Sequence, residues 1–572
     1  MNNQEISKVL EEVATLLALK KDNEFKIRAY KAAAEKVSTL NDDIANYVES
    51  ETIQDVKGIG PSISEKIKEL VRTGKLGFLK ELKKTVPAGL VDMLKIPGLG
   101  TKKIHLLNEK LSITTISELE SACKNNKLID IEGFSKKTQD NILKGIEYIN
   151  QFSGQYLYDF AQLKAGRILE YLKKNKKFTN LSLAGSIRRH KEIVKDIDIV
   201  ASGSDVKNLM EYFTKFTETS AVIAKGETKT SIRLIDGINV DLRIVESDLF
   251  PYALHHFTGS KDHNTAMRGR SKNLGIKMNE YGLFKQDKLI RCRTEEEIFS
   301  KLNLSFIPPE LRENMGEIEA AEQNKIPKLI EESDLKGVLH VHSKYSDGIN
   351  DIETLVKGCI SKGLSYLGLC DHSQSAYYAN GLKEPDLLNQ IKEIDLLNIK
   401  YKDFKIFKGI ESDIRPDGTL DYPEHILSKL DFVIGSIHSR FNMPEREMTN
   451  RILNAIKNPY FTILGHPTGR LLLAREGYKI DLIKIIDDSA KYGKIIELNS
   501  NPQRFDLDWR YLKYAKQKGV LISINPDAHT MEDIDDMFLG IGVARKGWLE
   551  PDNVINTFAT KKIIHLLGNK KP

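Results

Sequence analysis

The 572-residue sequence predicts a multidomain protein with an all-helical N-terminal domain, a central domain of strands and helices, and a C-terminal α/β barrel. Three observations predict these parts. A glycine-containing turn recurs ahead of helical patterns within residues 1–150. Aspartates alternate with apolar residues on a predicted strand near residue 197. After residue 336, histidines and acids end successive short apolar runs.

The composition excludes several classes of protein. Apolar residues make up 40% of the chain and charged residues 29%, which is typical of soluble globular domains. No apolar run reaches the length of a membrane span, and the first residues lack the basic start of a signal peptide. Four scattered cysteines without a CxxC pair fit a reducing cytoplasm rather than a disulfide framework or a zinc finger. The net charge is +6, and the basic excess lies in residues 151–310, which favours nucleic-acid binding there.

The N-terminal domain carries three copies of one turn. Val56-Lys-Gly58-Ile-Gly60 and Ile96-Pro-Gly98-Leu-Gly100 each lead into a helical pattern, and Ile131-Glu-Gly133-Phe-Ser135 is a weaker copy. Glycine allows the tight turn and leaves backbone N–H groups at the helix start open to a phosphate. An ordinary helix cap would explain any single copy. The repeated turn resembles the helix-hairpin-helix motif, which implies contact with DNA backbone at Gly58, Gly60, Gly98 and Gly100.

The same segment resembles the amino-terminal lyase domain of family X DNA polymerases. The resemblance is carried by Arg28-Ala-Tyr30-Lys31, by Gly58-Ile-Gly60 with Glu65-Lys66-Ile67, and by Thr73-Gly-Lys75-Leu76. It implies that Lys66 is the Schiff-base nucleophile of a deoxyribose-phosphate lyase. Ser62 stands where the family has a second supporting lysine, and an exposed helix lysine is the alternative interpretation of Lys66.

The central domain combines a Gly-Ser turn, an arginine pair and three aspartates. Gly185-Ser186-Ile-Arg188-Arg189 is followed by Asp196-Ile-Asp198 on an apolar strand, so both carboxylates face one way. A second strand supplies Asp241. Three convergent carboxylates form an oxygen site for two Mg or Mn ions, which stabilise phosphoryl transfer. The small residues let a triphosphate approach the backbone, and the arginines offer donors to phosphate.

This constellation resembles the α+β nucleotidyltransferase palm and thumb of family X DNA polymerases. Further matches are Lys225-Gly-Glu-Thr-Lys229, Phe257-Thr-Gly259-Ser260 and Glu280-Tyr-Gly282. The resemblance implies a catalytic role for Asp196, Asp198 and Asp241, which hold the two Mg or Mn ions. It implies DNA contacts for Lys229 and Arg268, and it implies a nucleotide site made by Gly185, Ser186, Arg189, Phe257, Gly259 and Asn264.

His256 departs from the family pattern, because vertebrate members have Tyr at this place beside the sugar pocket. Discrimination between ribo- and deoxynucleotides is therefore left open by the sequence. His255-His256 has a second interpretation as a metal pair, although adjacent strand residues face apart. Residues 311–336 are polar and acid-rich and predict a linker with one or two helical stretches, in which Ile318, Ala321 and Ile326 pack.

The last domain places metal-binding residue types at seven predicted strand ends. A single histidine at such a place is usually a hydrogen-bonded one, but packing does not explain seven. The carboxyl ends of barrel strands meet at one mouth, and His340 and His342, two apart on a strand, face the same way. Nitrogen and oxygen ligands suit Mn, Zn or Fe. The sequence therefore predicts a multi-metal hydrolase site.

These motifs resemble the PHP (polymerase and histidinol phosphatase) domain. The resemblance implies a distorted (β/α)7 barrel holding up to three Mn, Zn or Fe ions. All nine ligand positions of the family have a match: His340, His342, Asp347, His372, Glu411, His438, His466, Asp527 and His529. Asn525-Pro526 replaces the residues more usual before the last aspartate.

The chain as a whole resembles a prokaryotic family X DNA polymerase with a C-terminal PHP domain. The expected parts are a lyase-like domain (1–150), palm and thumb (151–310), a linker (311–336) and the PHP domain (337–572). The resemblance implies a DNA polymerase that fills short gaps in base-excision repair, using dNTPs on gapped or primer-template DNA. It also implies Mn-dependent 3′–5′ exonuclease activity, with 3′-end processing or cleavage at abasic (AP) sites as further activities. We expect a monomer in a prokaryotic cytoplasm, associated with the nucleoid.

Three alternatives remain open from the sequence. The PHP site is a small-molecule phosphatase in the first, which predicts phosphate release from free monoesters. The polymerase is inactive in the second, leaving a DNA-binding nuclease, although Asp196, Asp198 and Asp241 are all present. In the third the palm transfers nucleotides without a template, which a single-stranded primer would reveal.

Overall fold

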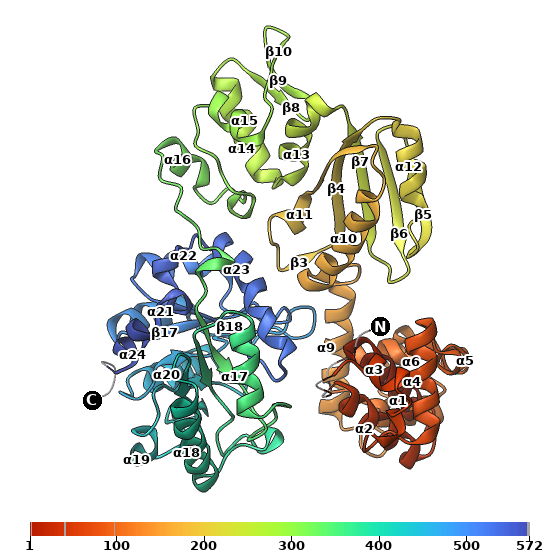
Figure 1. Cartoon of the computed structure of the whole chain (residues 1–572), viewed down its shortest axis with the longest axis vertical. Coiled ribbons are helices and arrows are strands. Elements are labelled where there is room, and N and C mark those ends of the chain that lie inside the picture. The colour runs from red at the N-terminus through yellow and green to blue at the C-terminus, as the bar shows by residue number, and fades with distance from the viewer. Residues whose placement is uncertain (2, 39, 41, 97, 569–572) are drawn as a thin grey trace. The chain divides into compact units, whose positions relative to one another are not determined.

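The computed structural model describes residues 1–568 except residues 2, 39, 41 and 97 (Figure 1). The chain divides into two compact units, Met1–Ser153 with Leu473–Arg475, and Gly154–Leu472 with Glu476–Pro572. Within the described residues no helix is both long enough and apolar enough to cross a membrane. The four cysteines are buried and free.

Among the described residues of 1–153, the N-terminal unit consists of helices joined by turns, with no strand. Its helices pack around a core that includes Leu10, Ile67 and Leu107, all fully buried. The repeated turns have the predicted geometry: Gly58 and Gly98 have positive φ angles of 101° and 79°, and Gly60 and Gly100 are helix N-caps. The helices are α1 (Asn3–Leu19), α2 (Glu24–Ser38), α3 (Ile44–Glu49), α4 (Pro61–Thr73), α5 (Gly77–Thr85), α6 (Ala88–Asp92), α7 (Thr101–Leu111), α8 (Ile116–Lys124) and α9 (Lys136–Gln151).

The palm is a five-stranded sheet of order β2-β4-β7-β6-β5. Its central strands β4 and β7 pair in parallel and place Asp198 opposite Asp241. The short helix α11 (Gly185–Arg188) follows β2 and carries the Gly-Ser turn. The other elements are α10 (Tyr158–Lys173), β2 (Phe178–Leu183), β4 (Asp196–Gly203), α12 (Val206–Thr214), β5 (Thr219–Lys225), β6 (Lys229–Leu234) and β7 (Asn239–Val245).

The thumb follows the palm and continues into the segment predicted as a linker. Ile318 and Ala321 of α16 (Glu317–Glu322) are buried in one cluster with Ile298 and Phe299, and Ile326 packs against it. This segment is therefore part of a packed core. The thumb elements are α13 (Phe250–Thr258), α14 (Lys261–Asn273), β8 (Lys277–Asn279), β9 (Gly282–Lys285), β10 (Lys288–Ile290) and α15 (Glu295–Lys301).

The C-terminal domain is a distorted parallel barrel with seven strand positions, which confirms the predicted fold class. The third position is broken into β13 and β14 at Gly409 and Ile410, and a bridge from His372 to Glu411 joins the two sheets. A bridge from Val341 to Ala528 closes the barrel. The strands are β11 (Gly337–Val341), β12 (Tyr366–Leu369), β13 (Lys405–Lys408), β14 (Glu411–Asp413), β15 (Ile434–Ser436), β16 (Ile463–Leu464), β17 (Ile495–Asn499) and β18 (Ile522–Asn525).

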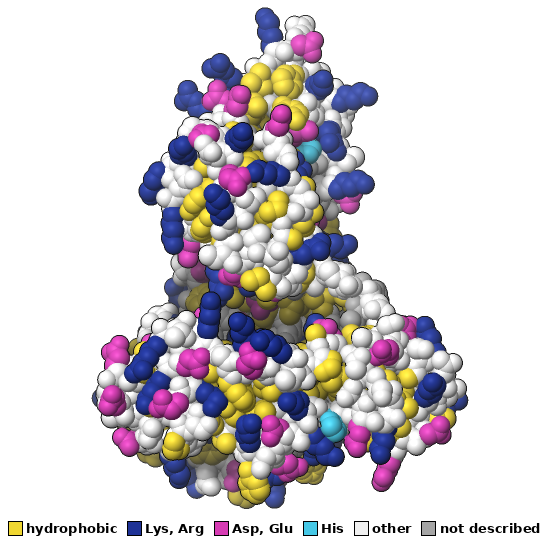
Figure 2. Space-filling view, turned by 90° about the vertical axis from the view of Figure 1, so that its right-hand side faces the viewer, with side chains coloured by type: hydrophobic (Ala, Val, Ile, Leu, Met, Phe, Trp, Pro, Cys, Tyr) yellow, Lys and Arg dark blue, Asp and Glu magenta, His cyan; other side chains and the backbone are white. Residues whose placement is uncertain are grey.

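Helices connect successive strands of the barrel and cover its outside (Figure 1). They are α17 (Ile352–Ser361), α18 (Glu384–Lys400), α19 (Glu424–Leu427), α20 (Glu445–Ile456), α21 (Leu482–Lys491), α22 (Trp509–Gln517) and α23 (Asp536–Lys546), with α24 (Thr560–Gly568) after them. On the face shown in Figure 2, Lys and Arg side chains are interspersed with Asp and Glu. That face therefore carries no single basic stripe.

Candidate active sites

The palm brings its three predicted carboxylates together. Asp196 and Asp198 alternate on β4, and Asp241 stands beside them on β7. Burial, together with Asp196 and Asp241, raises the pKa of Asp198 to about 7. Burial and Asp241 also raise the pKa of Asp196. Carboxylates that repel one another in a buried place are stabilised by bound divalent cations, so this donor set fits two Mg or Mn ions.

The Lys229 side chain points toward this cluster of carboxylates. Its ammonium forms an ion pair with the Asp241 carboxylate, across the antiparallel pairing of β6 and β7. The sequence resemblance implied contact between Lys229 and strand phosphates. In the structure its partner is a carboxylate of the cluster, where the ammonium offsets part of the negative charge.

A cavity of about 570 Å³ opens beside the carboxylates. Gly185 is required at its wall, because a Cβ atom there would lie 2.1 Å from Oδ2 of Asp198. The cavity gathers all the predicted nucleotide-site residues with two of the three carboxylates and the predicted DNA contact at Arg268. Its lining includes Gly185, Ser186, Arg189, Asp196, Asp198, His256, Phe257, Gly259, Asn264 and Arg268.

Two contacts orient the guanidinium of Arg189 in this cavity. Nε donates to Glu313 at 3.0 Å, and Nη1 donates to the main-chain oxygen of Thr258 at 2.5 Å. The neighbouring Arg188 is bound instead to Thr258 Oγ1 and Glu295, at 2.6 and 2.5 Å. Arg189 lines the cavity and Arg188 does not, so Arg189 is the arginine placed to bind an anion there.

The histidine pair His255-His256 does not form a metal site. His255 is fully buried against Phe299, and its ring centroid lies 5.3 Å from that ring. His256 lines the cavity instead. Among the described residues, neither histidine belongs to a cluster that could hold a metal ion.

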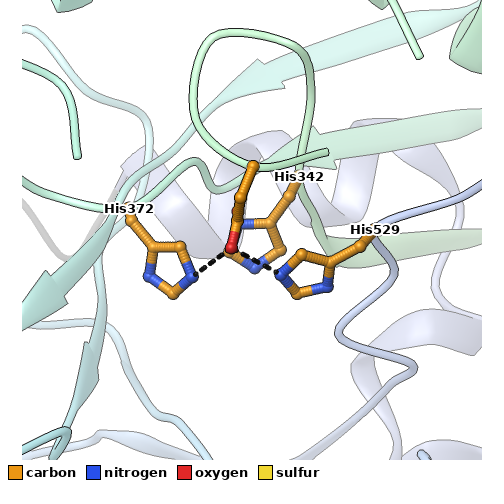
Figure 3. Close-up of side chains that lie close together, drawn as sticks. His342, His372 and His529 are labelled. Atoms are coloured by element: carbon orange, nitrogen blue, oxygen red, sulfur yellow. Dashed lines mark ion pairs between the residues drawn. The ribbon is translucent and has the colours of Figure 1, made fainter. Parts of the chain in front are cut away.

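In the barrel, the predicted ligands form three overlapping clusters. The first is built on the Asp347 carboxylate, which lies 3.4 Å from His529, 3.6 Å from His372 and 3.8 Å from His342 (Figure 3). The imidazoles come from the ends of β11, β12 and β18. The clusters are His342, Asp347, His372 and His529; His340, His342 and Asp527; and His372, Glu411 and His438.

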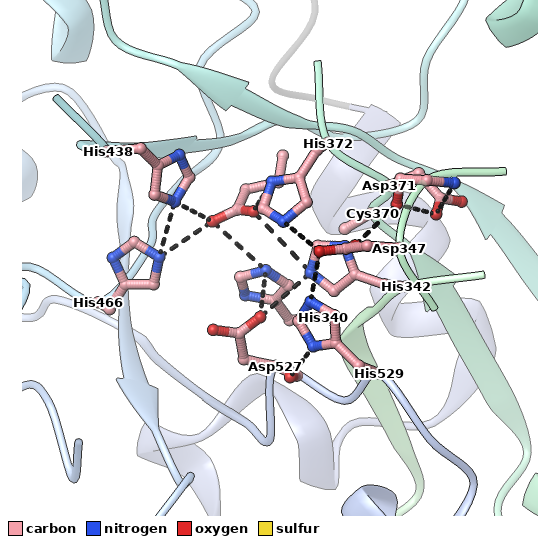
Figure 4. Close-up of polar contacts among 12 residues, drawn as sticks. His340, His342, Asp347, Cys370, Asp371, His372, His438, His466, Asp527 and His529 are labelled. Atoms are coloured by element: carbon pink, nitrogen blue, oxygen red, sulfur yellow. Dashed lines mark hydrogen bonds and ion pairs between the residues drawn. The ribbon is translucent and has the colours of Figure 1, made fainter. Parts of the chain in front are cut away.

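Glu411 stands at the centre of the third cluster. Its carboxylate lies 2.8 Å from Nδ1 of His372, 3.2 Å from Nε2 of His438 and 3.0 Å from Nε2 of His466 (Figure 4). Asp527 lies 3.1 Å from Nε2 of His342. All nine residues predicted from the sequence therefore lie at one mouth of the barrel.

The donor set fits several cations. Within the described residues, three buried nitrogens of the predicted ligands have no hydrogen-bond partner: His340 Nε2, His342 Nδ1 and His466 Nδ1. A buried polar atom without a partner costs free energy, which metal coordination would remove. Mixed imidazole and carboxylate ligands suit Mn, Zn or Fe.

The charges of these groups compensate one another. Burial opposes ionisation, but His438, His372 and His340 hold the pKa of Glu411 well below its ordinary value. Against burial, Glu411 and Asp413 raise the pKa of His438 to about 10. Burial and His529 lower the pKa of His342 to about 3. These groups thus combine a protonated imidazole at His438, a neutral imidazole at His342 and an ionised carboxylate at Glu411.

Two acids that the sequence prediction missed orient the ligands. Glu497, fully buried on β17, accepts from Nδ1 of His340 at 2.7 Å and from the main-chain N–H of His466 at 2.7 Å. Asp413 lies 2.5 Å from Nδ1 of His438. In both cases Nε2 is left facing the cluster, which is the usual arrangement behind a metal-bound histidine. In the sequence, a glutamate inside the apolar strand Ile495–Asn499 could have indicated the role of Glu497, because a buried acid needs a partner.

Another buried acid holds the loop that carries Asp347. Asp371 accepts from the N–H and hydroxyl of Ser343, at 2.8 and 2.7 Å, and from the hydroxyl of Ser346 at 2.5 Å (Figure 4). Cys370, beside it, is bound to the main-chain oxygen of Leu339. Asp371 therefore has a positioning role, and Cys370 packs in the barrel.

Lys66 lies at a pocket of about 500 Å³ in the N-terminal unit, together with Tyr30, Gly58 and Phe78. Its Nζ is 5.1 Å from the centre of the Phe78 ring and 3.0 Å from the hydroxyl of Ser62. Burial and the nearby Lys26 lower its pKa. A lysine with a lowered pKa beside a pocket has the properties of an amine nucleophile.

Four family models match the chain. They are the helix-hairpin-helix domain over residues 1–76, the SAM-like helix-hairpin-helix tandem over 90–147, the DNA polymerase beta thumb over 253–313 and the PHP domain over 339–501. The PHP match ends before Asp527 and His529, whose place in the site rests on the geometry described above.

Individual proteins match as well. The chain is 39% identical over 567 residues to the DNA polymerase/3′-5′ exonuclease PolX of Bacillus subtilis (strain 168), covering 98% of this chain and 99% of that protein. It is 31% identical over 252 residues to a probable phosphatase of Thermoanaerobacter sp. (strain X514), covering 41% of this chain and 97% of that protein. Among solved structures, the chain matches the crystal structure of Leishmania infantum polymerase beta, a ternary P/T complex, at 21% identity. The match covers 40% of this chain and 99% of that chain, with a TM-score of 0.27, and we draw no conclusion from it.

Proposed function

Because the chain belongs to the prokaryotic family X DNA polymerases that carry a C-terminal PHP domain, we propose that it is a DNA-directed DNA polymerase and a 3′–5′ exonuclease. The observation that carries this proposal is the presence of two complete and separate donor sets. Asp196, Asp198 and Asp241 form one in the palm, and the histidine and acid clusters form the other in the barrel.

The palm residues divide the work of nucleotide addition among themselves. Two Mg or Mn ions bound by Asp196, Asp198 and Asp241 would supply positive charge for the attacking and leaving oxygens. The Ser186 hydroxyl and Arg189 guanidinium, both on the cavity wall, bind the β and γ phosphates. Lys229 offsets charge at Asp241. The substrates are dNTPs and the primer end of gapped or primer-template DNA.

Residues next to the proposed triphosphate site would contact the sugar and base of the nucleotide. Phe257 and Gly259 line the side of the cavity where the sugar would lie, and Asn264 reaches the incoming nucleotide. Asn264 Nδ2 donates to the main-chain oxygen of His256 at 2.7 Å, which fixes its amide. Arg268 contacts the template strand from the same wall, and the turns at Gly58, Gly60, Gly98 and Gly100 bind DNA backbone.

The barrel residues serve hydrolysis of a phosphodiester. Up to three bound Mn, Zn or Fe ions would lower the pKa of water and polarise the phosphate. Glu497 and Asp413 fix the imidazoles of His340 and His438, so that the ligands need little rearrangement. We propose Mn-dependent cleavage from a 3′ end, with 3′-end processing or AP-site cleavage as further reactions of the same site.

These activities suit gap filling in base-excision repair. One centre lengthens a primer end, and the other removes nucleotides or blocking groups from a 3′ end. We further propose that the protein works as a monomer on chromosomal DNA in the cytoplasm, associated with the nucleoid.

A one-nucleotide-gapped duplex with a 5′-phosphate and a labelled primer tests the two-centre proposal. With four dNTPs and Mn, Asp198→Ala is expected to abolish primer extension and to keep primer shortening. His340→Ala is expected to do the reverse, and His425→Ala, which changes an exposed histidine of the same domain, to do neither. If His340→Ala still shortens the primer at the normal rate, the nuclease activity does not lie in the barrel.

A small-molecule phosphatase is the second candidate for the barrel. It is favoured by the 31% identity to a protein named as a probable phosphatase. Release of inorganic phosphate from free monoesters by a chain that leaves DNA intact would establish it. Degradation of DNA without monoester hydrolysis would exclude it.

For the N-terminal unit we propose deoxyribose-phosphate lyase activity at Lys66. The supporting observations are its pocket and its lowered pKa. Borohydride is expected to trap the chain on DNA that carries a 5′-deoxyribose phosphate. Lys66→Ala should lose this adduct, while Lys124→Ala, which changes an exposed lysine of α8, should retain it. Equal trapping of both variants would assign the adduct to another amine.

A further inference from the structure

Two adjacent tyrosines stand exposed beside the metal clusters of the barrel. Tyr377 is 85% exposed and Tyr378 70% exposed, on the 3₁₀ turn η6 (Tyr377–Ala379) between β12 and α18. The ring centroid of Tyr378 lies 6.1 Å from that of His372 and 6.3 Å from that of His438. Both histidines belong to the cluster centred on Glu411. An open aromatic ring therefore borders the site.

The orientation of the Tyr378 ring leaves a face available. Its plane makes angles of 60° and 76° with the planes of His372 and His438, so neither imidazole stacks on it, and most of the residue is exposed. Among the described residues, neither tyrosine hydroxyl has a hydrogen-bond partner. A planar ligand is therefore free to lie against the ring.

The turn that carries the tyrosines is anchored on both sides. The N–H of Ser373 donates to the main-chain oxygen of Glu411 at 3.0 Å, and the N–H of Leu382 donates to that of His372 at 2.8 Å. The N–H of Ser375 donates to Asp421 at 2.7 Å. Ala376 and Ala379, on either side of the tyrosines, are 1% exposed. The two rings are therefore held outward by a fixed backbone.

Packing does not explain this arrangement. Scattered exposed aromatic residues are normal on protein surfaces, because polar atoms do not cover the whole surface. Here two consecutive rings project from an anchored turn, and one of them touches imidazoles of a phosphoesterase-like site. Aromatic rings beside a nucleic-acid channel bind bases by stacking, without selecting a sequence, because every base has a π face.

We propose that Tyr377 and Tyr378 form a stacking site for unpaired nucleobases at the 3′ end of a DNA strand. A base held on Tyr378 directs the adjoining phosphodiester toward Glu411 and its histidines. The site takes single-stranded or frayed ends, because the faces of paired bases are already stacked within the duplex. This inference rests on the proposed nuclease function and names the part of the substrate that the barrel recognises.

The test uses the full-length chain and an oligonucleotide with 2-aminopurine at its 3′ end. Phosphorothioate linkages at that end slow cleavage, so that binding is read from quenching of the 2-aminopurine fluorescence. Tyr378→Ala is expected to weaken binding about 10- to 100-fold, which is the range of one lost base–aromatic stack. Tyr378→Trp is expected to restore it, since a larger ring stacks equally well.

A matched control is Tyr492→Ala, which removes an exposed tyrosine from the same domain. Tyr492 precedes β17 and so lies at the opposite end of the barrel strands from the metal ligands. It is expected to bind the oligonucleotide as the unaltered chain does. Tyr377→Ala gives an independent reading if Tyr378→Ala does not fold.

A second measurement compares two substrates under Mn. The ratio of kcat/KM for single-stranded DNA to kcat/KM for the same oligonucleotide with abasic tetrahydrofuran residues at its 3′ end, which have no base, is expected to fall at least about tenfold in Tyr378→Ala. Unchanged quenching and an unchanged ratio in Tyr378→Ala and Tyr377→Ala would overturn the stacking site. If the unaltered chain quenches the probe through Tyr378 yet cleaves no DNA, the stacking site stands and the nuclease proposal fails.

Discussion

Lys546 of the barrel donates a hydrogen bond to the main-chain oxygen of Arg189 in the palm, at 3.0 Å. The same ammonium lies 2.5 Å from Glu313, which also accepts from Nε of Arg189. Lys546 is 1% exposed, and its burial is the main cause that lowers its pKa to about 8. Helix α23 of the barrel therefore supports the loop that carries the proposed triphosphate-binding arginine.

This contact predicts that Lys546→Met weakens nucleotide binding by the palm. The change leaves the main-chain oxygen of Arg189 without the Lys546 donor and leaves Glu313 with Arg189 as its remaining donor, which costs about 1–3 kcal/mol and loosens the guanidinium. The KM for dNTP in primer extension is expected to rise about tenfold, with a smaller change in kcat.

The control for this prediction is Lys494→Met. Lys494 is also a buried lysine, and its Nζ donates to main-chain oxygens of Asn458 and Phe461, within the barrel. Both variants should lower Tm, but only Lys546→Met should raise the KM for dNTP. Equal KM values in the two variants would mean that Lys546 has only a structural role.

The raised pKa of Asp198 predicts a conflict between stability and function in the palm. Its pKa is about 7 in the fold, above the ordinary value near 3.8, chiefly because of burial. The folded state therefore binds this proton more tightly, and metal-free stability falls as pH rises from about 4 to about 7. Above pH 7 the ionised Asp198 carboxylate lowers the free energy of unfolding by its full amount, up to about 4 kcal/mol.

Asp198→Asn removes this penalty. The metal-free variant is expected to have a higher Tm than the unaltered chain at pH 8 and a similar Tm at pH 4, while primer extension is lost. Differential scanning calorimetry in EDTA measures the difference, and Asp248→Asn, at an exposed position, serves as the control. A lower Tm at pH 8 would show that the carboxylate is needed for folding.

The sequence predicts the candidate metal ligands and catalytic residues better than it predicts the side chains that hydrogen-bond to them. Strand-end spacing predicts that the histidines and acids of the barrel converge, because successive parallel strands bring their carboxyl ends to one mouth. The resemblance to the PHP family singles out nine of them as ligands. Asp196 and Asp198 follow from alternation on one strand, and the register of β4 and β7 places Asp241 of the second strand opposite Asp198. The repeated glycine turns likewise have the expected backbone conformation.

What the sequence does not reveal is contact between distant segments. The pairing of Lys229 with Asp241 depends on the register of β6 and β7, and Glu497 meets His340 across 157 positions. In the sequence, nothing distinguishes Lys546 from other basic residues near helix ends. Its contact with Arg189 is seen only in the structure. Such contacts depend on tertiary packing, which residue spacing within one segment does not encode.

Glu497→Gln is expected to weaken metal binding in the barrel. An amide in place of the carboxylate binds the Nδ1–H of His340 less strongly and no longer increases the basicity of the imidazole. Loss of such an outer ligand typically costs about 10- to 100-fold in metal affinity. Competition with a chelator, followed by metal analysis of the protein, measures the change.

Primer extension by Glu497→Gln serves as the control for this prediction, because the palm carboxylates are in a different domain and should work at the normal rate. Asp413→Asn provides a parallel test at His438, which Asp413 contacts at 2.5 Å. Metal affinity that stays unchanged in both variants would show that the two acids contribute to packing rather than to ligand orientation.

Metal loading of the barrel is expected to release protons. In the metal-free fold, against burial, Glu411 and Asp413 raise the pKa of His438 to about 10, and Asp347 and Asp527 raise that of His529 to about 9. Both imidazoles are therefore protonated at pH 7, and each must lose a proton before it binds a cation. Apparent affinity for Mn should rise with pH up to about 10.

Isothermal titration of the metal-free chain with Mn at pH 7 measures this release. Two buffers with different ionisation enthalpies should give observed enthalpies that differ, with at least two protons released per fully loaded site. His340, whose pKa Glu497, Asp527 and Glu411 raise well above its ordinary value against burial, contributes to this release as well. Asp413→Asn, which removes a neighbour that raises the pKa of His438, should release fewer protons. Identical enthalpies in the two buffers would mean that both imidazoles are neutral before the metal binds, and that the carboxylates alone carry the charge of the empty site.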